Sequence, residues 1–176
     1  MNYEVKHLKI NFKTLEEFKK FKEYGIQELS MLEELHAKIS DNEINSPFYG
    51  IYFGNSLVAR MSLYKRNKQY DQYFEPPQTY IEVWKLEVLS DFQRKGLGQT
   101  LVEYAKSFQL PIKTSPRVKS SDFWSKMGFV PVTYDIDRDL GENPLIWLPN
   151  GVANKNKQLI SSCLFYIYVV YMINMK

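Results

Sequence analysis

The most constraining feature of the sequence is a strand pattern that runs directly into a turn with two glycines and then into a helix pattern. Residues 79–89 predict a strand, and residues 96–108 predict a helix. Between them lies the run Gln93-Arg94-Lys95-Gly96-Leu97-Gly98. The first turn of a helix has unpaired backbone N–H groups and a partial positive charge, so this junction is suited to bind phosphate.

The residue types in this junction strengthen the phosphate interpretation. Gly96 and Gly98 have no side chains, which lets the backbone approach a phosphate closely. Arg94 and Lys95 add positive charge at the same place. A glycine pair on its own also fits an ordinary tight turn, so the junction alone leaves both interpretations open.

The rest of the sequence predicts one mixed domain of strands and helices. A capping box, with Thr14 as N-cap and Glu17 three residues later, predicts the start of the first helix. The resulting order is β-α-α-β-β-β-α-β-α-β-β, which places the chain in the α+β (mixed α/β) class with a sheet of about seven strands. We expect strands over residues 3–12, 48–53, 57–64, 79–89, 110–113, 129–134 and 145–148, and helices over residues 14–39 (interrupted at Gly25), 96–108 and 121–127.

Composition and charge exclude several classes of protein. The net charge is only +3, too weak for the concentrated basic face of a nucleic-acid-binding domain, so we expect no nucleic-acid partner. Cys163 is the only cysteine, which rules out an internal disulfide, and the N-terminal residues lack the apolar run of a secretory signal. We therefore expect a cytoplasmic protein. His7 and His36 are isolated, so no metal site is expected.

Two motifs resemble the GNAT N-acetyltransferase superfamily. The run from Gln93 to Gly98 matches the family pattern Gln/Arg-x-x-Gly-x-Gly/Ala, after the fourth strand and at the start of the third helix. The run Phe123-Trp124-Ser125-Lys126-Met127-Gly128-Phe129 resembles the second motif, an aromatic pair followed by Lys-x-Gly-Phe. The resemblance covers about residues 6–151, and more narrowly it is to a small uncharacterised branch from low-GC Gram-positive bacteria. It implies the acyl-CoA N-acyltransferase fold, with four helices flanking the sheet.

The resemblance also implies a cosubstrate, acetyl-coenzyme A (acetyl-CoA), and a way to bind it. The pantetheine arm would run along the fourth strand near Leu86 and Val88, with Phe123 as a further contact. The N–H of Val88 would bind the acetyl carbonyl and stabilise the oxyanion formed during transfer. The diphosphate would lie on the backbone N–H groups of Gln93, Arg94, Lys95, Gly96, Leu97 and Gly98.

Glu82 is the candidate general base. An amine with a lysine-like pKa of about 10.4 is mostly protonated at neutral pH, so some group must take its proton. Glu82 lies eleven residues before Gln93, where the histone-acetylating branch of the family places its glutamate base. A period of two also puts Glu82, Trp84, Leu86 and Val88 on one face of the strand. The alternative is that Glu82 pairs with a basic residue on the sheet surface.

The general acid is less well defined. Many family members have tyrosine as the second aromatic of the helix motif, where it protonates the departing thiolate. Trp124 stands at that position here, and an indole N–H is not a practical acid. Tyr134 or solvent would then supply the proton. Ordinary core packing is an equally good interpretation of Phe123, Trp124 and Phe129.

These features together predict an enzyme, an acyltransferase that moves acetyl directly from acetyl-CoA to a primary amine. The acceptor is a small molecule or a protein amine, and its contacts are expected from segments 14–39 and 66–78. The alternative is a non-catalytic acyl-CoA-binding sensor or regulatory protein, which the missing tyrosine favours. The oligomeric state stays open, with a homodimer among the options.

The C-terminal part of the chain differs in character from the rest. We divide the sequence into an acetyltransferase domain at residues 1–150 and an atypical apolar extension at residues 151–176. Residues 159–173 are nearly all apolar, but a helix of that length spans only about 22 Å, less than the ~30 Å hydrocarbon core of a bilayer. We therefore expect no membrane partner and a non-family extension. A membrane anchor and a packed extra element remain the alternatives.

Overall fold

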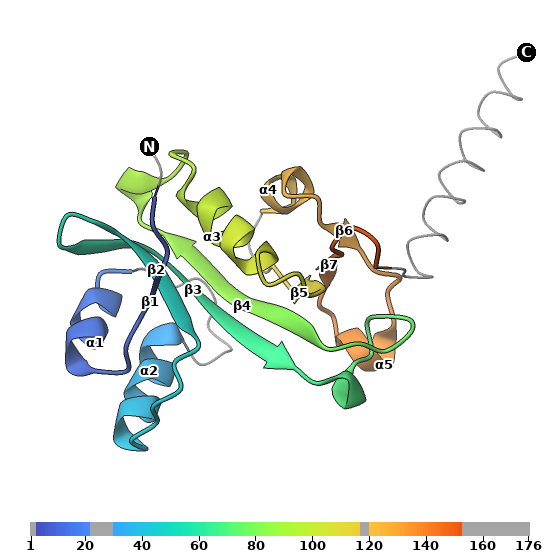
Figure 1. Ribbon diagram of the computed structural model, residues 1–176, viewed down its shortest axis with the longest axis horizontal. Coiled ribbons are helices and arrows are strands. Elements are labelled where there is room, and N and C mark those ends of the chain that lie inside the picture. Colours follow the sequence, from blue (N-terminus) through green and yellow to red (C-terminus); the bar gives the residue numbers. More distant parts are fainter. Residues whose placement is uncertain (1–2, 22–29, 117–119, 153–176) are drawn as a thin grey trace, which may run out of the picture.

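A mixed seven-stranded sheet forms the centre of the protein. The computed structural model describes residues 3–21, 30–116 and 120–152. The strand order is β1-β2-β3-β4-β5-β7-β6, and only the β4–β5 pair is parallel (Figure 1). The strands are β1 (Lys6–His7), β2 (Phe48–Phe53), β3 (Ser56–Arg66), β4 (Tyr80–Val88), β5 (Ile112–Thr114), β6 (Val130–Pro131) and β7 (Leu145–Trp147). The predicted fold class is confirmed.

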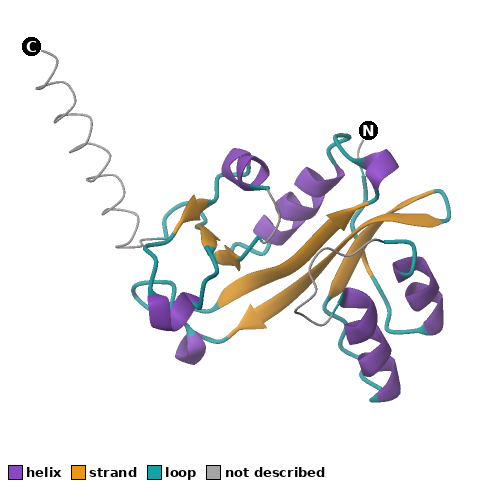
Figure 2. Cartoon of the chain, turned by 180° about the vertical axis from the view of Figure 1, so that it is seen from behind, coloured by secondary structure: helices purple, strands orange, loops and turns teal. Residues whose placement is uncertain are grey.

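Helices lie on both sides of this sheet. In Figures 1 and 2, α1 and α2 lie on one side of β2, β3 and β4, and α3 lies along the other side. Helices are present within each predicted helical segment, although the predicted interruption at Gly25 falls on residues 22–29, which lie outside the described residues. The polar loop before β7 also contains a single helical turn that the sequence did not predict. The helices are α1 (Phe12–Phe18), α2 (Met31–Ser40), α3 (Leu97–Lys106), α4 (Ser121–Lys126) and α5 (Ile136–Asp139), with short 3₁₀ turns η1 (Lys68–Tyr70) and η2 (Ser90–Phe92).

Each side of the sheet has its own hydrophobic core. On the α3 side, Leu97, Leu101 and Val102 pack with Met61 and Val83 from the strands. The core on the α1–α2 side is built from Leu8, Leu15, Phe18, Phe21, Met31, Leu35, Phe48 and Leu57. Burial of large apolar side chains contributes roughly 1.5–3 kcal/mol each, so these two cores fix the position of the helices on the sheet.

The N-terminal elements differ from the sequence prediction. The predicted strand over residues 3–12 was wrong in length, because α1 begins at Phe12 and β1 contains only two residues. Asn11 is the N-cap of α1, and its side chain accepts the Thr14 N–H at 2.8 Å. Thr14 is therefore not the cap, and asparagine is the stronger capping residue of the two. A capping box does exist, one helix later, between Ser30 and Glu33.

A bulge in β4 changes which side chains share a face. Leu63 pairs with Val83 and Ser62 pairs with Lys85, so Trp84 has no opposite residue on β3. Beyond the bulge the alternation reverses, as expected for one extra residue. Leu86 and Val88 therefore lie on the α3 side with Val83. The prediction that Glu82 shares their face was wrong, because Glu82 pairs with Tyr64 and lies on the α1–α2 side.

Two further predictions concern the outer parts of the chain. The apolar extension falls almost wholly on residues 153–176, which lie outside the described residues, so the division at residue 150 stays a prediction. Within the described part of the chain, no helix is long and apolar enough to cross a membrane. The same residues contain no group of three or more His, Cys, Asp or Glu side chains placed to hold a metal ion.

Candidate functional site

The site begins where β4 and β5 stop pairing. Their parallel register joins Ile81 to Ile112 and ends with Val83 opposite Thr114. From Trp84 to Val88, β4 continues with β3 on one side and, among the described residues, no strand on the other. We call this point the β4–β5 fork. A strand edge beyond a fork has backbone groups free to bind an extended ligand.

The turn between β4 and α3 leaves backbone N–H groups exposed at the helix start. Gly96 is the N-cap of α3 with φ of 85°, and no side chain caps the helix there. Nothing lies within 4 Å of the position that a Cβ on Gly96 would occupy. Arg94 also has a positive φ, of 61°, which is uncommon for a residue with a side chain. This shape fits an anion at the helix N-terminus.

Gly98 and Leu97 have a different role from Gly96. A Cβ on Gly98 would lie 3.4 Å from the Phe123 ring and 3.7 Å from a Leu86 methyl group, which is ordinary contact. Gly98 therefore packs against Leu86 and Phe123 rather than standing open. Leu97 is 1% exposed and anchors the first turn of α3 in the core. The structure thus brings together Leu86, Phe123 and the glycine-bearing turn, as the sequence analysis expected.

The end of β4 presents its backbone toward the open side of the fork. The Leu89 N–H donates to Val58 O on β3 at 3.0 Å. Successive N–H groups of a strand point to opposite edges, so the Val88 N–H points away from β3. The Val88 carbonyl accepts the Gln93 side-chain amide at 3.1 Å, which ties the turn to the strand.

Glu82 is held in ion pairs. Its carboxylate accepts hydrogen bonds from Lys113 Nζ and Arg66 Nε, each at 2.8 Å. Burial alone would raise the pKa of Glu82, but the hydrogen bonds and charges of Lys113 and Arg66 outweigh it and hold the pKa below its ordinary value. The alternative interpretation, that Glu82 pairs with a basic residue, is therefore present in the structure, although its pair with Lys113 is largely buried rather than exposed. Its role as base stays a prediction, and a lowered pKa weakens it.

The aromatic motif divides between core and site. Trp124 is buried at 5% exposed, and its ring packs edge-on against Phe123 and Phe129. The core-packing interpretation of Trp124 is confirmed. Tyr134, the candidate acid, follows β6 and is 52% exposed. No contact among the described residues links Tyr134 to the fork, so its catalytic role stays a prediction.

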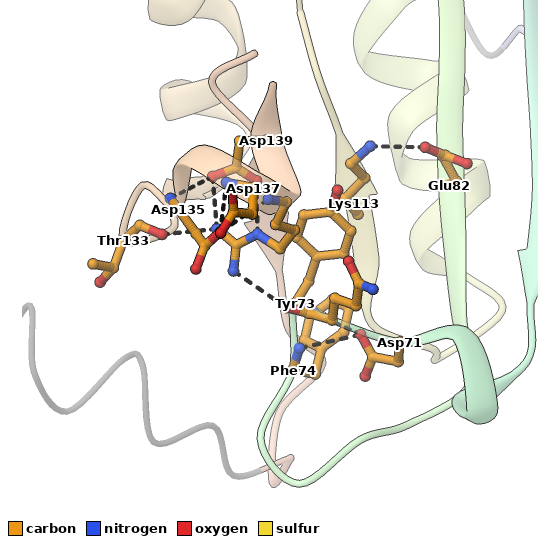
Figure 3. Close-up of polar contacts among 11 residues, drawn as sticks. Asp71, Tyr73, Phe74, Glu82, Lys113, Thr133, Asp135, Asp137 and Asp139 are labelled. Atoms are coloured by element: carbon orange, nitrogen blue, oxygen red, sulfur yellow. Dashed lines mark hydrogen bonds and ion pairs between the residues drawn. The ribbon is translucent and has the colours of Figure 1, made fainter. Parts of the chain in front are cut away.

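A second polar cluster, formed by Arg138, Asp139, Tyr73 and Lys113, lies next to the paired part of β4 and β5. Arg138 donates to both Asp139 oxygens and also to the Gln72 and Thr133 carbonyls. The Tyr73 ring lies between two cations, 4.9 Å from the Arg138 guanidinium carbon and 5.0 Å from Lys113 Nζ. Figure 3 shows Lys113 reaching from this cluster to Glu82. The loop of residues 66–78, expected to contact the acceptor, is thus fastened to α5 and β5.

One buried acidic residue was missed by the sequence analysis. Glu34 is only 7% exposed on α2, and the Tyr64 hydroxyl donates a hydrogen bond to its Oε1. Burial raises the pKa of Glu34 to about 7. The sequence did contain a sign that Glu34 is buried. It lies three residues after Met31 and one before Leu35, both of which are buried on the same helix face.

Comparisons with known proteins identify the relatives of this chain. The model of the acetyltransferase (GNAT) family matches residues 12–129. An uncharacterised N-acetyltransferase of Bacillus licheniformis is 68% identical over 88% of this chain and 97% of its own length. Another, from Oceanobacillus iheyensis, is 63% identical over the same shares of the two chains. Both confirm the resemblance to uncharacterised N-acetyltransferases of low-GC Gram-positive bacteria.

A solved structure gives the same result. It is the crystal structure of the Bacillus subtilis N-acetyltransferase YlbP in complex with coenzyme A, which is 62% identical to this chain. The match covers 85% of this chain and 98% of that one, with a TM-score of 0.74. The family model alone spans well over half of the sequence. The chain belongs to the acetyltransferase (GNAT) family.

Proposed function

We propose that this N-acetyltransferase transfers acetyl from acetyl-CoA directly to a primary amine. The observation that carries the proposal is the uncapped start of α3 at Gly96, next to the unpaired edge of β4. An exposed helix N-terminus suits a diphosphate, and a free strand edge suits an amide-bearing arm such as pantetheine. The coenzyme A complex of YlbP, which is 62% identical, supports the same ligand.

The residues around the turn fit each part of this cosubstrate. The diphosphate would rest on backbone N–H groups from Gln93 to Gly98, with the charges of Arg94 and Lys95 beside it. Leu86 and Phe123 would contact the pantetheine arm. The N–H of Val88 would donate a hydrogen bond to the acetyl oxygen, and one such donor to an oxyanion stabilises the transition state by about 3 kcal/mol.

The transfer needs one bond formed and one broken. Acetyl-CoA supplies the electrophilic thioester carbon, to which the amine nitrogen bonds while the carbon–sulfur bond breaks. The sulfur then takes a proton that the nitrogen loses. Direct attack is favoured over an acyl-enzyme, because the described residues include no cysteine to act as the nucleophile.

The test is thiol release from acetyl-CoA with a panel of small amines and lysine peptides. We expect release with at least one amine and a matching acetylated product by mass spectrometry. Binding of acetyl-CoA without release would favour the sensor alternative, and no binding would contradict the proposal. Comparing the full chain with one ended after Asn150 tests whether residues 1–150 form the catalytic domain.

A further inference from the structure

Glu34 is a buried carboxylate with only one of its two oxygens hydrogen bonded. It lies on the face of α2 that packs on the sheet, between the buried residues Met31 and Leu35. Its Oε1 accepts the Tyr64 hydroxyl, whereas its Oε2 is buried and has no hydrogen-bond partner among the described residues. A buried carboxylate oxygen without a partner is costly, so such a group in a native fold calls for a reason.

Two more buried side-chain oxygens are of this kind. Within the described ranges, Ser62 Oγ and Ser115 Oγ are the other buried side-chain oxygens without a partner. Ser62 lies opposite Lys85, just beyond the bulge in β4. Ser115 follows Thr114, the last residue of β5 that pairs with β4. Ser62 thus lies beside the part of β4 beyond the fork and Ser115 follows the end of β5, whereas Glu34 lies on α2 and contacts β3 through Tyr64.

Tyr64 connects Glu34 to the fork. Tyr64 pairs with Glu82 across β3 and β4, and its ring lies edge-on to Trp84, with the centroids 6.0 Å apart. Trp84 is the bulge residue and the first residue of β4 beyond the last β4–β5 pair. The side chain of Tyr64 is partly exposed, unlike that of Glu34. Tyr64 thus contacts the bulge residue at the fork through its ring and the buried carboxylate through its hydroxyl.

The direction of approach follows from the two faces of the sheet. Leu86 and Val88 pack toward the α3 side, where Leu97, Phe123 and Trp124 fill the space. A cosubstrate held at the start of α3 therefore reaches β4 from that side. The acceptor has to come from the opposite side, where Tyr64 and Glu34 lie.

On this basis, and resting on the proposed function, we propose that the Tyr64 hydroxyl contacts the acceptor amine as a catalytic residue and passes its proton to Glu34. The acceptor enters as a primary ammonium group. Tyr64 Oη takes one proton from the nitrogen while its own proton moves to Glu34 Oε1, which leaves a neutral amine and a protonated Glu34. After acetyl transfer, the second nitrogen proton goes to the sulfur, and Glu34 returns its proton to solvent.

The electrostatic surroundings suit Glu34 to this task. Burial raises its pKa to about 7, the positive charges of Lys38 and Lys85 act to lower it, and Glu43 acts to raise it. A base with a pKa near the working pH combines a large ionised fraction with useful basicity. Glu82 lies on the same face but is occupied by Lys113 and Arg66, which hold its pKa low.

The experiment is the pH dependence of kcat/KM for the best amine of the panel, from about pH 6 to about pH 10. For the wild-type chain, kcat/KM should rise through the pKa of Glu34 and then stay level until the ammonium acceptor itself loses its proton, at about 10.4 for a lysine-like amine. In Glu34→Gln and Tyr64→Phe we expect a loss of roughly 100-fold at neutral pH and a continued rise toward the amine pKa. Coenzyme A affinity should stay unchanged.

Tyr52→Phe is the matched control, because Tyr52 is a partly buried tyrosine packed on the same α1–α2 core. It should keep the wild-type profile. If both variants keep the wild-type profile, the inference is overturned while the proposed function stands. If the wild-type chain acetylates no amine, the proposed function itself fails. Should Glu34→Gln not fold, Tyr64→Phe decides the matter, since it removes one hydroxyl from a partly exposed ring.

Discussion

Lys113 faces Glu82 across the parallel pair of β4 and β5, and its Nζ lies 2.8 Å from Glu82 Oε1. The Lys113 side chain is 8% exposed and that of Glu82 is 13% exposed. This buried ion pair stands immediately before the fork, where the two strands stop pairing. It therefore holds β4 and β5 together at the base of the proposed acetyl-CoA site.

Glu82→Gln should destabilise the fold at neutral pH. Removing one partner of a buried pair leaves Lys113 without its anion, which costs about 3 kcal/mol or more. Because the pKa of Glu82 is lowered in the fold, its contribution is present above the ordinary carboxyl pKa and is lost as the pH falls through the folded value. Urea unfolding of both chains at neutral and acidic pH measures the difference, which should shrink in acid.

Glu16→Gln is the control for this variant. Glu16 pairs with Lys19 on the exposed surface of α1, so its loss should cost under about 1 kcal/mol.

The same Glu82→Gln protein also tests the prediction that Glu82 is the general base. A kcat/KM profile with an unchanged apparent pKa would leave Glu82 with the ion-pairing role alone, whereas a shifted profile would restore it as a base.

Gly96→Ala and Gly98→Ala should differ sharply. Gly96 has φ of 85°, a left-handed conformation that costs a residue with a Cβ about 1–2 kcal/mol. Gly98 has no positive φ, and its added methyl would meet Phe123 at ordinary distance. We expect Gly96→Ala to lower both stability and coenzyme A affinity, measured by ligand-dependent thermal shift, and Gly98→Ala to change both much less. Equal losses of stability and of coenzyme A affinity in the two variants would contradict the assignment of the left-handed, open position to Gly96 alone.

Glu34→Gln should stabilise the fold at pH values above neutral even as it lowers activity. Because the pKa of Glu34 is raised in the fold, the stability that its protonated form contributes is fully present below the unfolded pKa of 4.5. That contribution is lost as the pH rises through the folded pKa of about 7. The wild-type chain should therefore lose up to about 3 kcal/mol across this window, and the variant should not. Denaturant unfolding at about pH 4, below this window, and at about pH 8, above it, measures the loss. Parallel pH dependences for the two chains would refute the raised pKa.

Asp139→Asn should loosen the cluster that braces the loop of residues 66–78. Asp139 is 3% exposed and accepts hydrogen bonds from Arg138 and from the Asp135 N–H. Its replacement leaves buried donors poorly paired, which costs about 1–3 kcal/mol. Asp137→Asn, at an exposed position on the same turn, should stay within about 0.5 kcal/mol of the wild type in thermal unfolding. A similar loss of stability in both variants would mean that the contacts of Asp139 within the cluster do not account for the loss.

Much of the fold was predictable, because local patterns determine it. The β2–β3 hairpin, the strand before Ser90 and the helix after Gly96 each have a strong hydrophobic period and a turn residue at the right place. The helix start was less predictable, since Asn11 and Thr14 are both good caps and only the path of the chain decides between them. The short helix α5 was not predictable from hydrophobic spacing, because it lies in a polar segment and begins at Asp135, whose side chain caps its N-terminus.

The site was only partly predictable, for a specific physical reason. The turn is determined by local sequence, so its place between β4 and α3 and the open position of Gly96 followed from the pattern, whereas the packing of Gly98 against Phe123 did not. The face of Glu82 depends on a bulge at Trp84, and one extra residue reverses every side chain after it. Glu34 and Tyr64 are 30 residues apart in the sequence. Their contact arises from packing of α2 on β3, which no local pattern encodes.

Isothermal titration calorimetry with coenzyme A and with pantetheine, which lacks the diphosphate, tests whether the α3 N-terminus binds the diphosphate. We expect one coenzyme A per chain and an affinity for pantetheine weaker by roughly tenfold or more, which corresponds to about 1.4 kcal/mol or more. Gly96→Ala should reduce that preference for coenzyme A. No detectable binding of coenzyme A, or equal affinities for the two ligands, would contradict the assignment of the α3 N-terminus as the diphosphate site.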